Sequence, residues 1–204
     1  MVISTEQTFV MVKPDGVVMG LTGEIVRRIE QRGLKIVALK MFQPTRDQMD
    51  KHYPKNEEWI NRLGEKSQST YEKYNIDMKA ELGTGDTMAV GKMVRDWILD
   101  FMTAAPVVTM VVEGLHAVDM VRKLVGQTVP AFADVGTIRG DYSVDSPALA
   151  NAQKRAISNI VHASETAQEA AHEIAHWFTP AEIVSYVRND PAVISGRPSD
   201  AKSP

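Results

Sequence analysis

Four apolar runs along the chain have the length and composition of buried β-strands. The first two occupy residues 8–12 and 34–42, and the second is rich in Ile, Val and Leu. Residues 106–113 are apolar almost throughout, which is typical of a central strand with both faces covered. The fourth run, 159–161, leads directly into a lone histidine, His162. The pattern therefore predicts four strands.

Amphipathic segments separate these runs and predict helices. Residues 20–31 and 117–125 show helical spacing of their apolar positions, and each segment is followed by glycine. A third helix begins at the capping-box signature of Thr166 and Glu169 and continues to Phe178. The order strand, helix, strand, strand, helix, strand predicts a ferredoxin-like α+β fold (βαββαβ), an antiparallel sheet with helices on one face.

Further segments are added to that core. The capping box of Thr45 and Gln48 predicts a short helix that ends at Tyr53. Residues 55–103 are polar and helical, with an interruption at 83–85, and contain too few apolar residues for a core of their own. Four smaller assignments complete the chain: a sharp turn at 14–16, a tight glycine-bracketed loop at 136–141, an extra helix at 147–158 and a last short helix at 180–187.

Composition narrows the class of protein. A hydrophobic content of 44% and a charged content of 24% are those of a globular domain, and the net charge of −3 predicts no nucleic-acid partner. The absence of cysteine excludes disulfides and thiolate metal sites. Residues 1–7 do not resemble a signal peptide, and the longest apolar run, 106–112, is too short to cross a bilayer. We therefore expect a cytoplasmic protein with no membrane partner.

His162 is the first candidate for chemistry. The sequence places it at the junction between a strand and the amino terminus of a helix, a position that favours anions. An imidazole at such a position can act as a base, a metal ligand or a nucleophile. The structural alternative is a strand-end histidine satisfied by one backbone bond. Lys13, Arg122, Thr128 and Arg139 also fall at element ends or in loops, where binding groups gather on a rigid scaffold. Because a polyphosphate needs several cations to replace its hydration, these residues are candidates for phosphate contacts.

Four motifs, taken in order, resemble those of nucleoside diphosphate kinases. They are Val-Lys-Pro-Asp-Gly at 12–16, His52-Tyr53, Gly-Thr-Ile-Arg-Gly-Asp at 136–141 and Asn-Ile-Val-His-Ala-Ser-Glu at 159–165. The resemblance covers most of the chain apart from two insertions, at about 55–91 and about 145–158, and is greatest to the long forms familiar from archaea. On this basis residues 1–187 form a single domain, and residues 188–204 are predicted to be a mobile tail.

The resemblance implies a function and a set of site residues. The γ-phosphate of a nucleoside triphosphate would pass to a nucleoside diphosphate by a ping-pong mechanism, through a phosphohistidine at His162. Glu173 would hold the far nitrogen of that imidazole, and Asn159 with Lys13 would meet the ribose hydroxyl. Phosphate contacts are implied for Lys13, Tyr53, Arg122, Thr128 and Arg139. The implied cofactor is Mg²⁺, carried by the nucleotide phosphates without protein ligands, and the implied assembly is a homo-oligomer, a hexamer or a tetramer.

Two alternatives compete with this interpretation. A catalytically idle, nucleotide-binding scaffold of the same family should have lost His162 or the surrounding cations, and this chain keeps them. A zinc-dependent hydrolase would use His172 and His176, which fit H-E-x-x-H, but would leave the cations without a role. The family's paired phenylalanines, one of which stacks on the base, would fall at Val94 and Arg95. The base-stacking ring is therefore left open, with Trp59 as a candidate.

Overall fold

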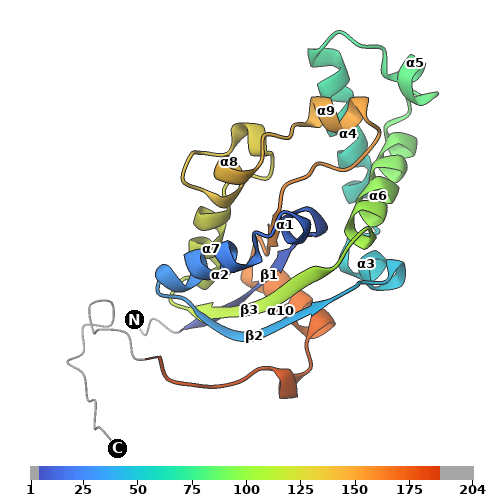
Figure 1. Ribbon diagram of the computed structural model, residues 1–204. Helices are drawn as coiled ribbons and strands as arrows, with labels where there is room; N and C mark the ends of the chain where they lie inside the picture. The colour runs from blue at the N-terminus through green and yellow to red at the C-terminus, as the bar shows by residue number, and fades with distance from the viewer. Residues whose placement is uncertain (1–4, 189–204) are drawn as a thin grey trace, which may run out of the picture.

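The structure, a computed structural model, describes residues 5–188 and contains one antiparallel sheet (Figure 1). Its strands are β1 (Glu6–Val12), β2 (Lys35–Phe42), β3 (Val107–Gly114) and β4 (Val161–Ala163). Their order in the sheet is β2-β3-β1-β4, so β1 and β3 are central. In β1, Val10 lies opposite Met110 of β3 and opposite Ala163 of β4. This arrangement confirms the predicted ferredoxin-like fold.

Helices cover both faces of the sheet. The side chains of β1, which point alternately to the two faces, show which helices cover each face. Val10 and Val12 face α2 (Thr22–Gln31) and α7 (Ala117–Val125), the two helices of the βαββαβ core. Phe9 and Met11 face the opposite way, where α3 (Arg46–His52), α6 (Thr87–Thr103) and α10 (Ala167–Trp177) pack. All four side chains are completely buried, because successive residues of a central strand point to opposite faces.

The predicted helical excursion is built from α4 (Glu57–Lys73), α5 (Met78–Leu82) and the first part of α6. It extends from one end of the sheet together with α9 (Pro147–Ala152) (Figure 1). A Cβ on Gly64 would lie 1.8 Å from the carbonyl oxygen of Thr87, and one on Gly91 would lie 1.9 Å from that of Ile60. Glycine at these two positions therefore lets α4 and α6 pack with their backbones in contact. No helix among residues 5–188 is both long and apolar enough to cross a membrane.

Two segments predicted to be irregular are short helices. The expected turn after Lys13 is α1 (Pro14–Val18), which begins with a proline at its first position. The expected loop at 136–141 contains α8 (Ile138–Tyr142), because the hydroxyl of Thr137 accepts from the backbone N–H of Gly140 and caps a helical turn. The prediction of a tight loop was therefore wrong. A short 3₁₀ turn, η1 (Pro130–Phe132), precedes it.

The helix expected at 180–187 is also wrong, since only the 3₁₀ turn η2 (Pro180–Glu182) forms. The chain beyond it follows β2 instead. The N–H of Val184 donates to the carbonyl of Val37 at 2.8 Å, at the point where the register of β2 shifts, and Arg188 donates to the carbonyl of Leu34. The N–H of Val184, which a local helix would pair, is satisfied by this long-range bond instead. The rest of the predicted tail, 189–204, lies outside the described residues.

Candidate active site

His162 is held at the predicted strand-to-helix corner by an unusual backbone turn. The N–H of Val161 bonds the carbonyl of Asn159 at 2.7 Å, which closes a γ-turn around Ile160 at φ +69°. A β-branched residue rarely adopts a positive φ. Ile160 keeps it because its N–H donates to Asp15 at 2.9 Å, its carbonyl accepts from Lys13, and its side chain is buried.

The imidazole of His162 is oriented by a buried carboxylate. Its Nε2 lies 2.7 Å from Oε1 of Glu173, and Oε2 of Glu173 accepts from the hydroxyl of Ser164 at 2.6 Å. Glu173 is two turns into α10 and only 3% exposed. A carboxylate acceptor places the imidazole proton on Nε2, which leaves the lone pair on Nδ1. Within residues 5–188, Nδ1 has no hydrogen-bond partner.

His52, which is buried, belongs to the His52-Tyr53 motif but received no role from the sequence. It ends α3 and packs edge-on against His162, with the ring centroids 5.1 Å apart. Its Nδ1 accepts from the indole N–H of Trp177 at 3.3 Å. Burial lowers the pKa of His52 to about 3 and also lowers the pKa of His162, where the charge of Lys13 adds to the effect. Both imidazoles are therefore neutral near pH 7, as a nitrogen nucleophile requires.

Lys13, Asn159 and Thr128 form one hydrogen-bonded chain beside this histidine pair. The ammonium of Lys13 donates to Oδ1 of Asn159 at 2.6 Å, and Nδ2 of Asn159 donates to the backbone carbonyl of Thr128 at 2.8 Å. The hydroxyl of Thr128 is not used in this chain. Burial and the nearby charge of Arg139 lower the pKa of Lys13 to about 8. A half-buried cation of this kind gains from an anionic ligand.

The two candidate phosphate-binding arginines, Arg139 and Arg122, differ in how tightly their side chains are held. Arg139 is 7% exposed and donates to the backbone carbonyls of Gly126, Asn159 and Val161, at 2.8, 3.2 and 2.7 Å. Burial, followed by the charge of Arg122, lowers the pKa of Arg139 to about 10. Arg122 has an exposed side chain whose contact with Glu165 is long, at 3.5 Å. Arg139 thus fixes the chain around His162, while Arg122 is free to turn toward a ligand.

Tyr53 packs edge-on against His52, with the two ring centroids 4.9 Å apart. Burial raises the pKa of its phenol. The centroid of its ring also lies 6.2 Å from that of Trp59, with the two ring planes 30° apart, which brings the candidate base-stacking ring to the edge of the site. Arg95, at one of the expected phenylalanine positions, instead pairs with Asp50 at 2.8 Å and donates to the carbonyl of Pro54. It therefore connects α6 to the end of α3.

The zinc alternative has no geometric support. His172 is exposed, His176 bonds the carbonyl of Gln48 at 3.0 Å, and Glu173 between them points inward to His162. Among residues 5–188, the one group of three potential metal ligands is His52, His162 and Glu173, with donor atoms within 4.8 Å of one another. Neither His172 nor His176 belongs to this group. The H-E-x-x-H residues therefore do not converge on a common site.

The sequence of the chain is similar to those of known proteins. The sequence model of the family described as nucleoside diphosphate kinase matches residues 6–63 and 88–183. A relative named nucleoside diphosphate kinase from Pyrobaculum aerophilum is 46% identical over 179 residues, 88% of this chain and 98% of its own. Another from Pyrococcus furiosus is 38% identical over 90% of this chain and 89% of its own.

Solved structures give the same result. A crystal structure of an NDP kinase from Pyrobaculum aerophilum superposes with a TM-score of 0.86 at 44% identity, covering 89% of this chain and all of that one. A transition-state mimic of the nucleoside-diphosphate kinase from Borrelia burgdorferi, with bound vanadate and ADP, gives a TM-score of 0.73 at 34% identity, with coverage of 92% and 95%. Sequence, fold and relatives agree, and the chain belongs to the nucleoside diphosphate kinase family.

Proposed function

We propose that Nδ1 of His162 is the atom through which this kinase transfers its phosphoryl group. As a family member the protein is a phosphotransferase that moves the γ-phosphate of a nucleoside triphosphate to a nucleoside diphosphate in two half-reactions. In the first, the Nδ1 lone pair forms a bond to the γ-phosphorus while the bond to the bridging oxygen breaks, and the diphosphate leaves. In the second, a terminal oxygen of another diphosphate forms the new bond and the N–P bond breaks.

The contact between His162 and Glu173 is the observation that carries this proposal. It fixes the tautomer with the Nδ1 lone pair available, and it places a carboxylate where the imidazole becomes positive as the N–P bond forms. Ser164 holds the second carboxylate oxygen, so Glu173 cannot rotate away without breaking two bonds. Burial keeps the free imidazole neutral and therefore nucleophilic near pH 7.

The neighbouring polar groups are assigned to the nucleotide. The loose phosphoryl transition state needs mainly positioning and positive charge. Lys13, Arg122 and Arg139 supply the charge, while the hydroxyls of Tyr53 and Thr128 donate to phosphate oxygens. Asn159, already bonded to Lys13, meets the ribose hydroxyl together with that lysine. The substrate is the Mg²⁺ complex of the nucleotide, so the ion arrives on the phosphates and requires no protein ligand.

Several observations support these assignments. The Borrelia burgdorferi relative, 34% identical to this chain, has been captured with vanadate and ADP. The half-buried Lys13 and the exposed, loosely paired Arg122 are the kinds of cation that an incoming phosphate would satisfy. We also propose, on the family resemblance, that the protein assembles as a homo-oligomer. The cytoplasmic location stays a prediction from the sequence.

The test is a direct search for the intermediate. The protein is incubated with γ-labelled ATP and Mg²⁺, and we expect an acid-labile, base-stable label that ADP removes as ATP. His162→Ala should keep the fold, because the side chain is partly exposed, yet carry no label and transfer no phosphate. His172→Ala, a matched change of an exposed histidine, should label normally. Labelling of His162→Ala at the wild-type level would exclude His162 as the nucleophile.

A further inference from the structure

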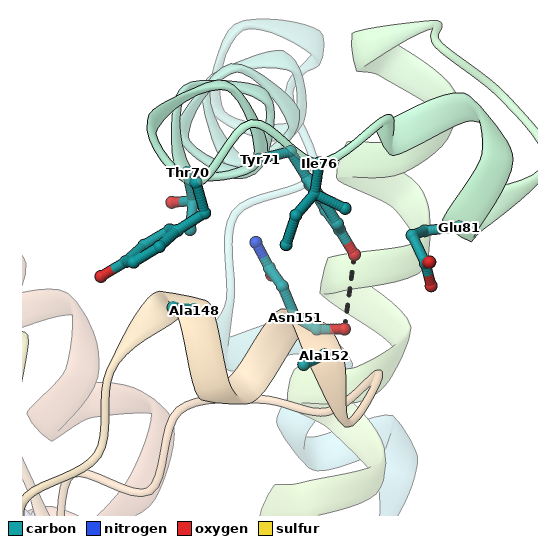
Figure 2. A pocket seen from close by; sticks show the side chains of 8 residues that line it. Thr70, Tyr71, Ile76, Glu81, Ala148, Asn151 and Ala152 are labelled. Carbon is teal, nitrogen blue, oxygen red and sulfur yellow. Dashed lines mark hydrogen bonds between the residues drawn. The ribbon is translucent and has the colours of Figure 1, made fainter.

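A cavity of about 160 Å³ lies away from the active site, between α4, the turn that leads into α5, and α9 (Figure 2). Tyr71, Tyr74 and Ile76 contribute its apolar walls, and Asn151 and Glu81 contribute polar groups. None of the candidate active-site residues lines it. The family sequence model passes over residues 64–87, which supply the α4 and α5 side of the cavity. The α4 and α5 side of the cavity therefore lies outside the part of the chain that matches the family model, whereas the α9 side, with Ala148, Asn151 and Ala152, lies within it.

Asn151 is the reason to regard this cavity as a binding site. The residue is 8% exposed, and its Nδ2 is fully buried without a hydrogen-bond partner in the described part of the chain. Figure 2 shows the side-chain amide projecting from α9 into the space below α4, toward Ile76 and Thr70. A buried donor left unpaired is costly, and native structures contain few. A ligand with a hydrogen-bond acceptor would satisfy it.

Glu81 determines what else the ligand must carry. Glu81 lines the same cavity, is exposed to solvent, and its carboxylate has no hydrogen-bond or ion-pair partner among residues 5–188. No lysine or arginine lines the cavity, so a phosphate would meet one negative charge and no positive one. The ligand should therefore present an acceptor toward Asn151 and an N–H donor toward Glu81.

The size of the cavity and the chemistry of its walls narrow the class of ligand further. An apolar cavity of roughly 150 Å³ accommodates a single benzene ring, so this one suits a single six-membered ring. The side chains of Tyr71 and Tyr74 supply aromatic surface, and aromatic rings stack on nucleobases. We propose that the cavity binds a cytosine ring, as the base, the nucleoside or the base end of a nucleotide. Its exocyclic amino group donates to Glu81, a pairing that carboxylates commonly make, and its ring acceptors face Nδ2 of Asn151.

The test is titration of the full-length protein with cytidine, followed by calorimetry and by NMR. Saturating Mg²⁺–ADP is present to fill the active site. We expect cytidine to bind under these conditions, and uridine, which presents a carbonyl to Glu81, to bind at least about tenfold more weakly. CMP should bind no more tightly than cytidine, since the phosphate gains no cation. Loss of cytidine binding on addition of ADP would assign it to the active site and overturn the proposal, as would the absence of binding.

Two variants test whether cytidine binds in this cavity. Asn151→Leu keeps the side-chain size and removes the amide, and Glu81→Gln keeps the size and removes the charge. Each should weaken cytidine binding by about tenfold while phosphoryl transfer from ATP stays at the wild-type rate. Glu72→Gln, a change on the exposed side of α4, is the control and should bind normally. If Asn151→Leu is unfolded by circular dichroism, Glu81→Gln decides alone. Unchanged binding in a folded variant of either residue would overturn the proposal.

Discussion

Replacement of Glu173 by Gln tests how the buried carboxylate contributes to phosphoryl transfer. The change keeps the shape of the side chain and an oxygen for Nε2 of His162, but removes the negative charge. Hydrogen bonds to charged groups contribute about 1.5–3 kcal/mol, and this contact is short, at 2.7 Å, and 3% exposed on the Glu173 side. Since about 1.4 kcal/mol is a factor of ten, formation of the phosphohistidine should slow by about ten- to a hundredfold.

The measurement is a single-turnover experiment on the first half-reaction. Enzyme is mixed rapidly with a range of Mg²⁺–ATP concentrations, and the maximal rate of phosphohistidine formation is separated from the concentration that gives half of that rate. Because Glu173 is buried behind His162, it should not touch the nucleotide, so the loss should lie in the maximal rate. Ser164→Ala, which leaves the charge but frees one carboxylate oxygen, should cause a smaller loss of the same kind.

Two results would refute this reasoning. A Glu173→Gln enzyme within about twofold of the wild-type maximal rate would mean that the charge is not felt in the transition state. A loss confined to the ATP concentration dependence would mean that Glu173 acts on nucleotide binding. Circular dichroism of each variant should show an unchanged fold, so that neither result can be attributed to unfolding.

Three further predictions address the surrounding groups. The lowered pKa of Lys13, about 8, makes the lysine neutral above that pH in the free enzyme. In a pH–rate profile, kcat/KM for ATP should therefore fall about tenfold per pH unit above pH 8. Lys13→Arg should abolish this fall at high pH. His176→Ala and removal of zinc by a chelator should leave the exchange rate unchanged, and loss of activity in either steady-state assay would restore the zinc hypothesis. Without a matching phenylalanine pair, kcat/KM for ADP, GDP, CDP and UDP should agree within about tenfold; a hundredfold preference would show specific base contacts, from Trp59 or the insertion.

The order of elements could be predicted from the sequence because it rests on local patterns. Apolar runs with period-two or continuous hydrophobicity mark β1, β2 and β3, and the capping box of Thr45 and Gln48 forms as expected, with both reciprocal bonds present. The motif residues could also be identified, because Lys13, Arg139, Asn159 and His162 stand at element ends in a recognisable order. Glu173 was assigned by the resemblance, and its 2.7 Å contact with His162 agrees with that assignment.

Other features depend on contacts between distant parts of the chain. The positive φ of Ile160 is maintained by Asp15 and Lys13, about 145 residues earlier, and no local preference of isoleucine predicts it. His52 gains its place beside His162 only because α3 packs on the face of the sheet where Phe9 and Met11 lie, and His162 of β4 stands opposite Met11. The segment after η2 pairs with β2 because Val37 offers a free carbonyl where the register of that strand shifts. The local sequence sets the propensity to form each helix or strand. Burial and long-range hydrogen bonds decide in which conformation the backbone polar groups are all paired, and their partners come together only in the folded chain.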